Sequence, residues 1–282
     1  MFLPLLLLLF FFLCTPSCLP YPTTLPQNST AAVIIFRSNS SSLQGRRRLT
    51  ETLHNPHATE RYVFFPGKPR WARRMPMVLT YAFFKENWMS NLSLKDVRAV
   101  FRKAFSKWAH VVPVSFEETD DYGYADIKIG FYRGDHSDGQ AFDGVLGVLA
   151  HSFSPEIGRL HLDAAETWAV DFEKEKSAVA VDLESVATHE IGHLLGLGHS
   201  SVRESVMYPS LKPREKKANL EVDDVEGVQA LYGSNPNFKF ESLELESDTS
   251  DTQPPVSTCT MACPFSLPFF FLIFPCHFFL FP

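Results

Sequence analysis

The sequence predicts an α+β fold in which helices pack against one mixed β-sheet. Its 282 residues, 45% hydrophobic and 21% charged, suffice for one well-buried domain with tails and exclude a fully disordered chain. Between residues 61 and 233 the hydrophobic patterns follow one another as strand, helix, several strands, helix and helix. That order is typical of helices that cover a single sheet.

The periodicity of the sequence predicts each element. Residues 77–84 (MVLTYAFF) read as a strand, and residues 93–111 place apolar side chains at helical spacing behind Ser93, a candidate N-cap. Short strands are expected next at 114–118, 125–132, 148–153 and 158–164. A second helix is expected at 182–198, where glycines end it, and a third at 222–231, closed by Gly233.

Both ends of the chain carry apolar runs. Residues 1–20 are expected to be a signal peptide, because MFLPLLLLLFFFL has the length of a signal core; a buried N-terminal helix or strand is the alternative. Residues 21–60 are expected to be a short pro-region or linker, and residues 234–263 an acidic, Ser/Thr/Pro-rich tether. The apolar tail at 264–282 is left open between a GPI-attachment signal, a membrane span and a reading-frame extension.

Charge and cysteine content limit the partners, the means of stabilisation and the cellular location that can be expected. A net charge of −6 gives no reason to expect nucleic acid as a partner. All cysteines lie outside residues 19–258, so the domain has no disulfide and depends on its core or on bound metal ions. Sequons at Asn28, Asn39 and Asn91 agree with a secretory route to the extracellular space or cell wall.

The strongest signal for chemistry is HEIGHLLGLGH at residues 189–199, which matches H-E-x-x-H-x-x-G-x-x-H. His189 and His193 stand one helical turn apart, so both imidazoles can face a single ion. Gly196 lets the chain leave the helix and bring His199 back as a third ligand. Three imidazoles with an open fourth position describe a catalytic zinc, because a structural zinc is closed by a fourth protein ligand.

Glu190 is expected to be the general base beside that metal. It can take a proton from the attacking water and pass it to the leaving amine, which allows amide hydrolysis without a covalent intermediate. The alternative is that the histidines are ordinary core residues. Five fixed positions would coincide by chance in about one chain in a hundred thousand, which favours the metal site.

The zinc helix and its surroundings resemble those of plant matrix metalloproteinases, the matrixins within the metzincins. The similarity extends over residues 61–233, with Ser200 directly after the third histidine and Met207, in SVMYP, matching the Met-turn beneath the metal. YVFFPGKPRW and LEVDDVEGVQALYG match as well. The resemblance implies a metzincin catalytic domain with a twisted five-stranded mixed sheet, three helices and an active-site cleft across the zinc helix.

The resemblance also implies further metal sites. The expected ligands of a structural zinc, a closed set of three nitrogens and one oxygen, are His136, Asp138, His151 and His161. The expected calcium ligands are side-chain oxygens of Asp143, Asp163 and Glu166 and carbonyl oxygens of Gly144, Leu146 and Val148. Val145 and Leu146 replace the family's small residues in that loop, and a second calcium site is left open.

For the substrate, the resemblance implies an extended peptide beside an edge strand at Leu149 and Ala150, with an apolar side chain in a pocket bounded by residues 208–219. Family precursors carry a pro-domain whose cysteine binds the catalytic zinc, and residues 21–60 contain no cysteine. Either the enzyme lacks this latency and is active once folded and metallated, or the chain is a divergent or truncated precursor. The first reading is preferred.

Together these observations predict a secreted, monomeric zinc endopeptidase that hydrolyses internal peptide bonds of extracellular-matrix or cell-wall proteins. Its substrate is expected to be protein or peptide, and membrane anchorage through the apolar tail is left open. The alternative is a catalytically silent, metal-stabilised binding module, which would have no need of Glu190. A structural wall protein is disfavoured, because the domain sequence has no repeats or low-complexity segments.

Overall fold

The computed structural model of the chain describes residues 31–36, 61–86, 88 and 92–240, with the backbone alone for 31–36. The expected signal peptide, the apolar tail and most of the expected tether lie outside the described residues. Among the described residues, no helix has both the length and the apolar character needed to cross a membrane. All of them belong to one structural unit.

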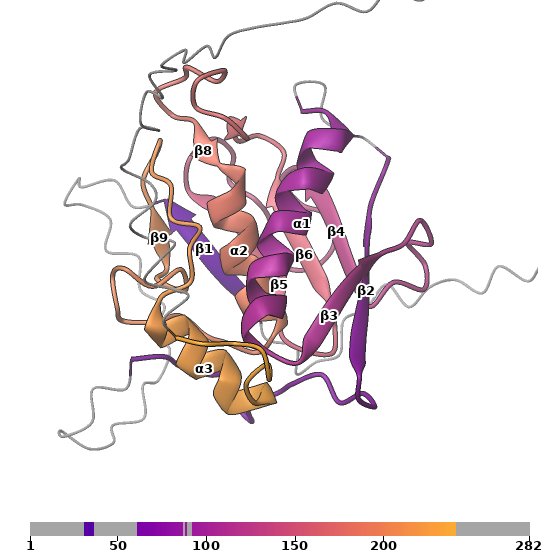
Figure 1. Cartoon of the computed structure of the whole chain (residues 1–282). Helices are drawn as coiled ribbons and strands as arrows, with labels where there is room; N and C mark the ends of the chain where they lie inside the picture. Colours follow the sequence, from indigo (N-terminus) through magenta and orange to yellow (C-terminus); the bar gives the residue numbers. More distant parts are fainter. Residues whose placement is uncertain (1–30, 37–60, 87, 89–91, 241–282) are drawn as a thin grey trace, which may run out of the picture. The chain divides into compact units, whose positions relative to one another are not determined.

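Seven strands of the described chain form one mixed sheet (Figure 1). β2 pairs in parallel with β3 and β4, and β4 with β6, whereas β5 runs antiparallel to β6. The run from β3 to β5 is the five-stranded mixed sheet that the sequence predicts, and this prediction is confirmed. The order across the sheet is β3 (Val114–Glu118), β2 (Met77–Phe83), β4 (Ile127–Tyr132), β6 (Arg159–Asp163), β5 (Val148–Phe153), β1 (Ala31–Phe36) and β9 (Ser210–Leu211). A separate parallel pair joins β7 (Trp168–Ala169) to β8 (Val181–Asp182).

The β5 side of the sheet differs from expectation. Residues 31–36, which the sequence places in a pro-region or linker, form β1, antiparallel to β5 and parallel to β9. β5 is therefore an interior strand and not the expected edge strand. The run AAVIIF contains the β-branched residues that favour strands, but the polar and proline-rich sequence around it hides this signal in an analysis of composition.

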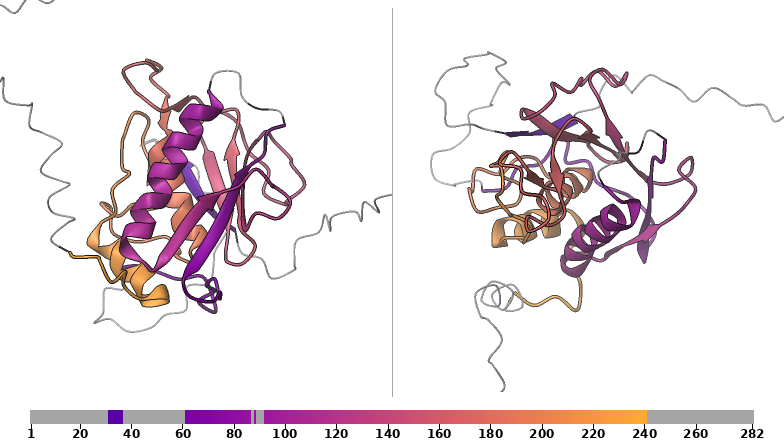
Figure 2. Two further views of the ribbon diagram at one scale, coloured as in Figure 1. Left: turned by 45° about the vertical axis from the view of Figure 1, so that its right-hand side comes forward. Right: turned by 90° about the horizontal axis from the view of Figure 1, so that it is seen from above.

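Three helices are found in the described residues, as the sequence predicts. α1 (Leu94–Val111) begins after Ser93, whose side chain accepts a hydrogen bond from Asp96 N at 3.0 Å. α1 and α2 (Leu183–Leu194) lie side by side on one face of the sheet, and α3 (Val222–Tyr232) lies at their C-terminal ends (Figures 1 and 2).

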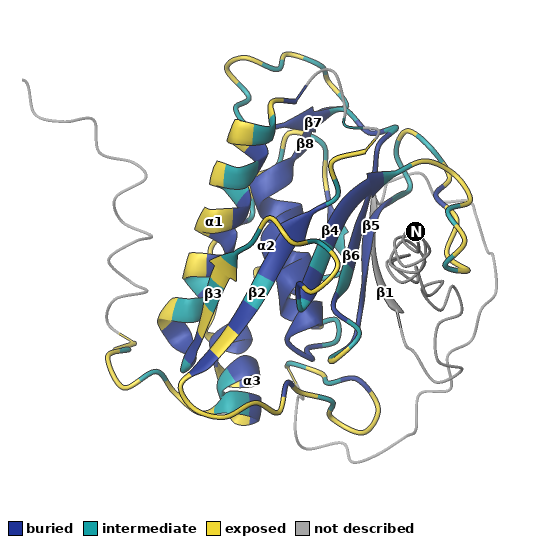
Figure 3. Cartoon of the chain, turned by 90° about the vertical axis from the view of Figure 1, so that its right-hand side faces the viewer, coloured by how far each residue is buried: buried dark blue, intermediate teal, exposed yellow. Residues whose placement is uncertain are grey.

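The two long helices differ in burial. α1 turns one side to solvent, whereas every residue of α2 is buried (Figure 3). Trp108 of α1 is fully buried and donates its indole Nε1–H to Thr188 O of α2 at 2.9 Å. α2 is thus an interior helix, which can hold polar side chains away from water.

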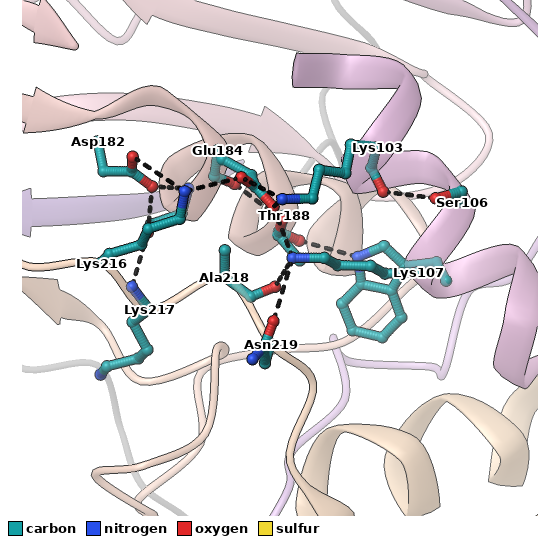
Figure 4. A network of polar contacts seen from close by, with 12 residues as sticks. Lys103, Ser106, Lys107, Asp182, Glu184, Thr188, Lys216, Lys217, Ala218 and Asn219 are labelled. Atoms are coloured by element: carbon teal, nitrogen blue, oxygen red, sulfur yellow. Dashed lines mark hydrogen bonds and ion pairs between the residues drawn. The ribbon is translucent and has the colours of Figure 1, made fainter. Parts of the chain in front are cut away.

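A buried carboxylate ties α2 to its neighbours (Figure 4). Glu184, in the first turn of α2, lies 2.7 Å from Lys107 Nζ and 3.0 Å from the ammonium groups of Lys103 and Lys216. Lys107 also donates to Ala218 O at 2.6 Å, so one ammonium group joins α1, α2 and the segment ahead of α3. Burial acts to raise the pKa of Glu184, but the hydrogen bonds and charges of the lysines outweigh it and lower the pKa to about 2.

We expect Glu184→Gln to lower the free energy of unfolding by about 2 kcal/mol at pH 7. A pKa lowered from 4.5 to about 2 corresponds to roughly 3 kcal/mol at 1.36 kcal/mol per unit, and solvent screens part of it because Lys103 and Lys216 are more than half exposed. Since the folded-state pKa is the lower one, this stability is present above pH 4.5 and is lost as the pH falls toward 2.

Urea unfolding across this pH range measures the difference. Glu173→Gln is the matched control, because Glu173 pairs with Lys176 on the surface with its side chain 89% exposed, and its loss should not be measurable. Equal losses for both variants, or a difference that does not change with pH, would contradict the assignment.

Candidate metal centres

The first histidine cluster is built on α2. His189 and His193 lie one helical turn apart, with ring centroids separated by 4.6 Å. Beyond the helix the chain turns back, and the His199 ring comes within 5.3 Å of His189 and 4.8 Å of His193. One ligand nitrogen from each ring lies within 4.8 Å of the other two. The structure therefore brings together the three residues that the sequence predicts for the catalytic zinc.

The turn between the second and third histidines requires a glycine. Gly196 has φ +106°, in a region that side chains with a Cβ atom rarely adopt. A Cβ atom at this position would also collide with Pro69 O. The positive φ angle of Gly196 turns the chain back, so that His199 approaches α2. The missing Cβ atom leaves room for Pro69 O.

Backbone carbonyls determine which nitrogen of the His189 and His193 rings is free. His189 Nδ1–H donates to Val206 O at 2.6 Å and His193 Nδ1–H to Leu197 O at 2.8 Å, since a carbonyl oxygen can only accept. The Nε2 atoms of His189, His193 and His199 are buried and have no hydrogen-bond partner among the described residues. A buried lone pair without a partner costs free energy unless a ligand meets it, so this donor set fits a metal ion.

Burial also keeps the three imidazoles in the neutral form that binds metal. It lowers the pKa of His189 to about 3 and that of His199 to about 4. The pKa of His193 is held well below 6.5 by burial as well. Protons therefore do not compete for the ligand nitrogens near neutral pH.

Glu190 follows the first ligand on α2 and is fully buried. Burial raises the pKa of its carboxyl group to about 8. A carboxylate with such raised proton affinity is suited to accept a proton and then release it to another group. The predicted general base therefore lies beside the cluster in an environment that suits proton transfer.

Residues 205–207 pack against α2 at Gly192, directly before the second histidine, and we call this segment the floor. Met207 is 2% exposed and packs against α2 at Gly192. A Cβ atom on Gly192 would collide with Met207 Sδ and would lie 3.0 Å from the Trp108 ring. The absence of a side chain at position 192 thus allows α1, α2 and the Met207 segment to meet.

Asp224, in the first turn of α3, holds the floor in place. Its carboxylate accepts hydrogen bonds from Val206 N at 2.9 Å and Met207 N at 3.2 Å, and from the Ser205 hydroxyl. Because Val206 O holds the His189 ring, Asp224 positions this ligand through a single residue. Sequence reasoning gave Asp224 no role, although it lies in a matching motif, because only the folded chain brings it to the floor.

The second cluster gathers the four residues expected to bind a structural zinc, His136, Asp138, His151 and His161. His151 and His161 face each other across β5 and β6. Asp138 Oδ2 lies 2.7 Å from one ring nitrogen of each of them and 2.8 Å from His136 Nε2. Burial acts to raise the pKa of Asp138, but the histidine hydrogen bonds outweigh it and hold this pKa far below its usual range. Zinc ligands in a tetrahedron are about 3.3 Å apart, so a small expansion would admit the ion.

The loop expected to bind calcium brings three carboxylates near one another. Glu166 is 3% exposed, and burial together with the charges of Asp163 and Asp143 raises its pKa to about 7. Leu146 N donates to Glu166 at 2.6 Å and Gly144 N donates to Asp163 at 3.2 Å. Among the described residues only the two histidine clusters bring ligand atoms within 4.8 Å of one another, so the acidic set is more open than either.

The residues expected to flank a substrate also lie close to the first cluster. Leu149 and Ala150 are fully buried in β5, which packs against α2. The segment expected to bound an apolar pocket, residues 208–219, contributes β9 on the far side of β1. β1 therefore runs where the substrate peptide is expected.

Comparison with known proteins places this chain in a family. A family model described as Matrixin matches residues 70–233, more than half of the chain. Metalloendoproteinase 4-MMP of Arabidopsis thaliana is 69% identical over 194 residues, which cover 69% of this chain and 56% of that protein. Metalloendoproteinase 1-MMP of the same plant is 62% identical over 194 residues, covering 68% and 52%. The interstitial collagenase of Oryctolagus cuniculus is 40% identical over 179 residues, covering 62% and 36%. The chain spans about half the length of the plant relatives.

We expect Gly192→Ala to weaken zinc binding and to destabilise the fold, because its methyl group would displace Met207 from α2 next to the ligand His193. Overpacking of about 1–3 kcal/mol exceeds the gain in helix propensity of about 1 kcal/mol. Urea unfolding and zinc titration against a chromophoric chelator measure the two effects. Gly123→Ala is the control, because a Cβ atom there meets nothing closer than 3.4 Å. A Gly192→Ala variant with unchanged stability and zinc affinity would contradict the packing argument.

Proposed function

The chain belongs to the matrixin family, and from this premise we propose that it is a zinc-dependent endopeptidase that hydrolyses internal peptide bonds of extracellular proteins. The observation that carries the proposal is the first histidine cluster. Three buried Nε2 atoms without a hydrogen-bond partner among the described residues converge beside a buried carboxylate.

His189, His193 and His199 would hold the catalytic zinc. Zinc bound there supplies a Lewis acid that polarises a carbonyl group and lowers the pKa of water to about 7. Val206 O and Leu197 O keep the first two rings oriented with Nε2 toward the cluster centre. Three protein ligands leave room for substrate, as a catalytic centre needs.

Glu190 carries the proton in the proposed reaction. Hydrolysis adds water across the peptide bond, so that the hydroxyl group joins the carbonyl carbon and a proton must reach the leaving nitrogen. Glu190 accepts the proton from the attacking water and delivers it to the amine as the C–N bond breaks. Burial raises the pKa of its carboxyl group, so the ionised carboxylate has a high affinity for the proton that it takes from water.

The other metal sites have structural roles in this proposal. A second zinc would be held by His136, Asp138, His151 and His161, whose side chains already surround Asp138 Oδ2. A calcium ion would neutralise the acidic loop, where the repulsion between Glu166 and its neighbours favours a cation. Carbonyl oxygens of Gly144, Leu146 and Val148 would complete its shell.

We place this activity outside the cell, in a catalytic domain at residues 61–233. The signal-like run at 1–13 and the sequons support secretion. Similarity to an interstitial collagenase supports an extracellular protein as substrate. Anchorage through residues 264–282 stays a prediction from the sequence.

The rival function is a metal-stabilised binding module without catalysis. Such a module gains nothing from a fully buried carboxylate on the residue directly after a metal ligand, since burial of a carboxylate costs free energy. Glu190 is therefore the residue that separates the two functions.

We expect Glu190→Gln to fold and bind zinc but to lose at least about a hundredfold in kcat, because glutamine keeps the shape of the side chain and cannot accept the proton. Mass spectrometry of a digested peptide library measures cleavage, and elemental analysis measures zinc. Glu184→Gln, on the same helix but outside the first cluster, is the control and should keep most of its turnover. Unchanged turnover in Glu190→Gln would refute the endopeptidase proposal.

We expect Asp138→Asn to reduce the zinc content from two ions per chain to one, because an amide is a poorer ligand than the carboxylate at the centre of the second cluster. Elemental analysis after dialysis measures zinc, and the same run should find one calcium in both proteins. Asp135→Asn is the control, since that exposed carboxylate lies in the same loop outside the cluster. Two zinc ions retained in Asp138→Asn would exclude this site.

A further inference from the structure

β1 lies between β5 and β9 in the sheet (Figure 1), and we call the place that it fills between these two strands the groove. On one side it pairs antiparallel with β5, and on the other its last two residues pair in parallel with β9. The pairs with β5 are Ala31–Phe153, Ala32–Ser152, Val33–His151, Ile34–Ala150 and, after a register shift, Ile35–Val148. The pairs with β9 are Ile35–Ser210 and Phe36–Leu211.

This groove is the place where a substrate peptide is expected. Its β5 wall contains Leu149 and Ala150, and its β9 wall belongs to the segment 208–219. α2, which carries Glu190 and two of the three histidines, has Cα atoms within 8 Å of those of β1. An extended peptide in this groove finds backbone partners on both sides, which is the physical basis of peptide binding by strand addition. β1 thus has the location and the backbone pairing of a bound substrate.

The sequence of β1 also suits that role. AAVIIF contains no charge, no proline and no glycine, and its β-branched residues favour an extended backbone. Residues 37–60 join it to the domain within the same chain. A tethered segment of this kind has an effective concentration on the order of millimolar, so it competes strongly with a free peptide at micromolar concentration.

We propose that residues 31–36 are an internal competitor for the substrate groove, a strand that must leave before an extended, uncharged, aliphatic peptide can bind. The identification of the groove rests on the proposed function. The competitor acts through backbone hydrogen bonds and needs no thiol. It would therefore restrain the enzyme without the cysteine that residues 21–60 lack.

The alternative is that β1 is a permanent strand of the fold. The two readings differ in what happens when β1 is removed. If β1 is a competitor, its removal leaves a folded domain with an open groove. If it is a permanent strand, its removal destabilises the whole sheet. Paired prolines test this, because proline donates no hydrogen bond and does not fit an interior strand.

The first experiment is hydrogen exchange on the zinc-loaded full chain carrying Glu190→Gln, which needs no catalysis. Adding Val33→Pro and Ile34→Pro should speed exchange in residues 148–153 at least about tenfold and leave α1 protected. The control pair Ser41→Pro and Ser42→Pro, outside β1, should change neither. A synthetic peptide of residues 29–38 should restore the protection of 148–153, and the same peptide with prolines at positions 33 and 34 should not.

The second experiment is peptide cleavage by the full zinc-loaded chain with Glu190 intact. Val33→Pro and Ile34→Pro should lower KM about tenfold at unchanged kcat, as expected when an intramolecular competitor is removed. The 29–38 peptide should raise KM again.

Unchanged exchange in 148–153, or loss of protection throughout the domain, overturns the proposal. If the exchange results agree but no variant cleaves peptide, the competitor stands and the endopeptidase proposal fails. If the chain cleaves peptide with the same KM in all variants, the endopeptidase stands and the competitor fails.

Discussion

The first cluster depends on one constraint: three ring nitrogens stay close together in the interior without protons and without a hydrogen-bond partner among the described residues. Two of the rings achieve this by directing their other nitrogen to a backbone carbonyl, that of Val206 or Leu197. The remaining lone pairs carry a desolvation cost that no hydrogen bond from the described part of the chain compensates. A bound ion offsets that cost, so the fold and the metal are energetically coupled.

The support for this arrangement comes from distant parts of the chain. Trp108 of α1 and Met207 of the floor meet where α2 carries a glycine, so the packing there depends on an absent side chain. Asp224 of α3 holds the floor through backbone amides, and Glu184 anchors the start of α2 with lysines from two sides. The helix that carries the first two histidines is therefore fixed at its start by Glu184, and the segment packed against it is fixed by Asp224.

The features that could be predicted from the sequence are those set by residues close together in the chain. A helical repeat of four brings His189 and His193 together, and a glycine accounts for the turn to His199, so the first cluster, the helices and the central strands could be predicted. The second cluster needed a family resemblance, because its members come from a loop and two strands. β1 and Asp224 were missed, since the first lies within a polar segment and the second acts only through a contact made on folding. Pairing between distant segments has no local signature.

β5 serves two sites with consecutive residues. Ala150 borders the groove, and His151, the next residue, belongs to the second cluster. A strand whose side chain is clamped by an ion cannot slip by one residue without breaking that bond, and a slip would exchange its two faces. In the metal-loaded protein the second zinc would therefore fix the register of β5. Although this ion lies in the second cluster, it would determine which residue of a bound peptide faces each position of the groove.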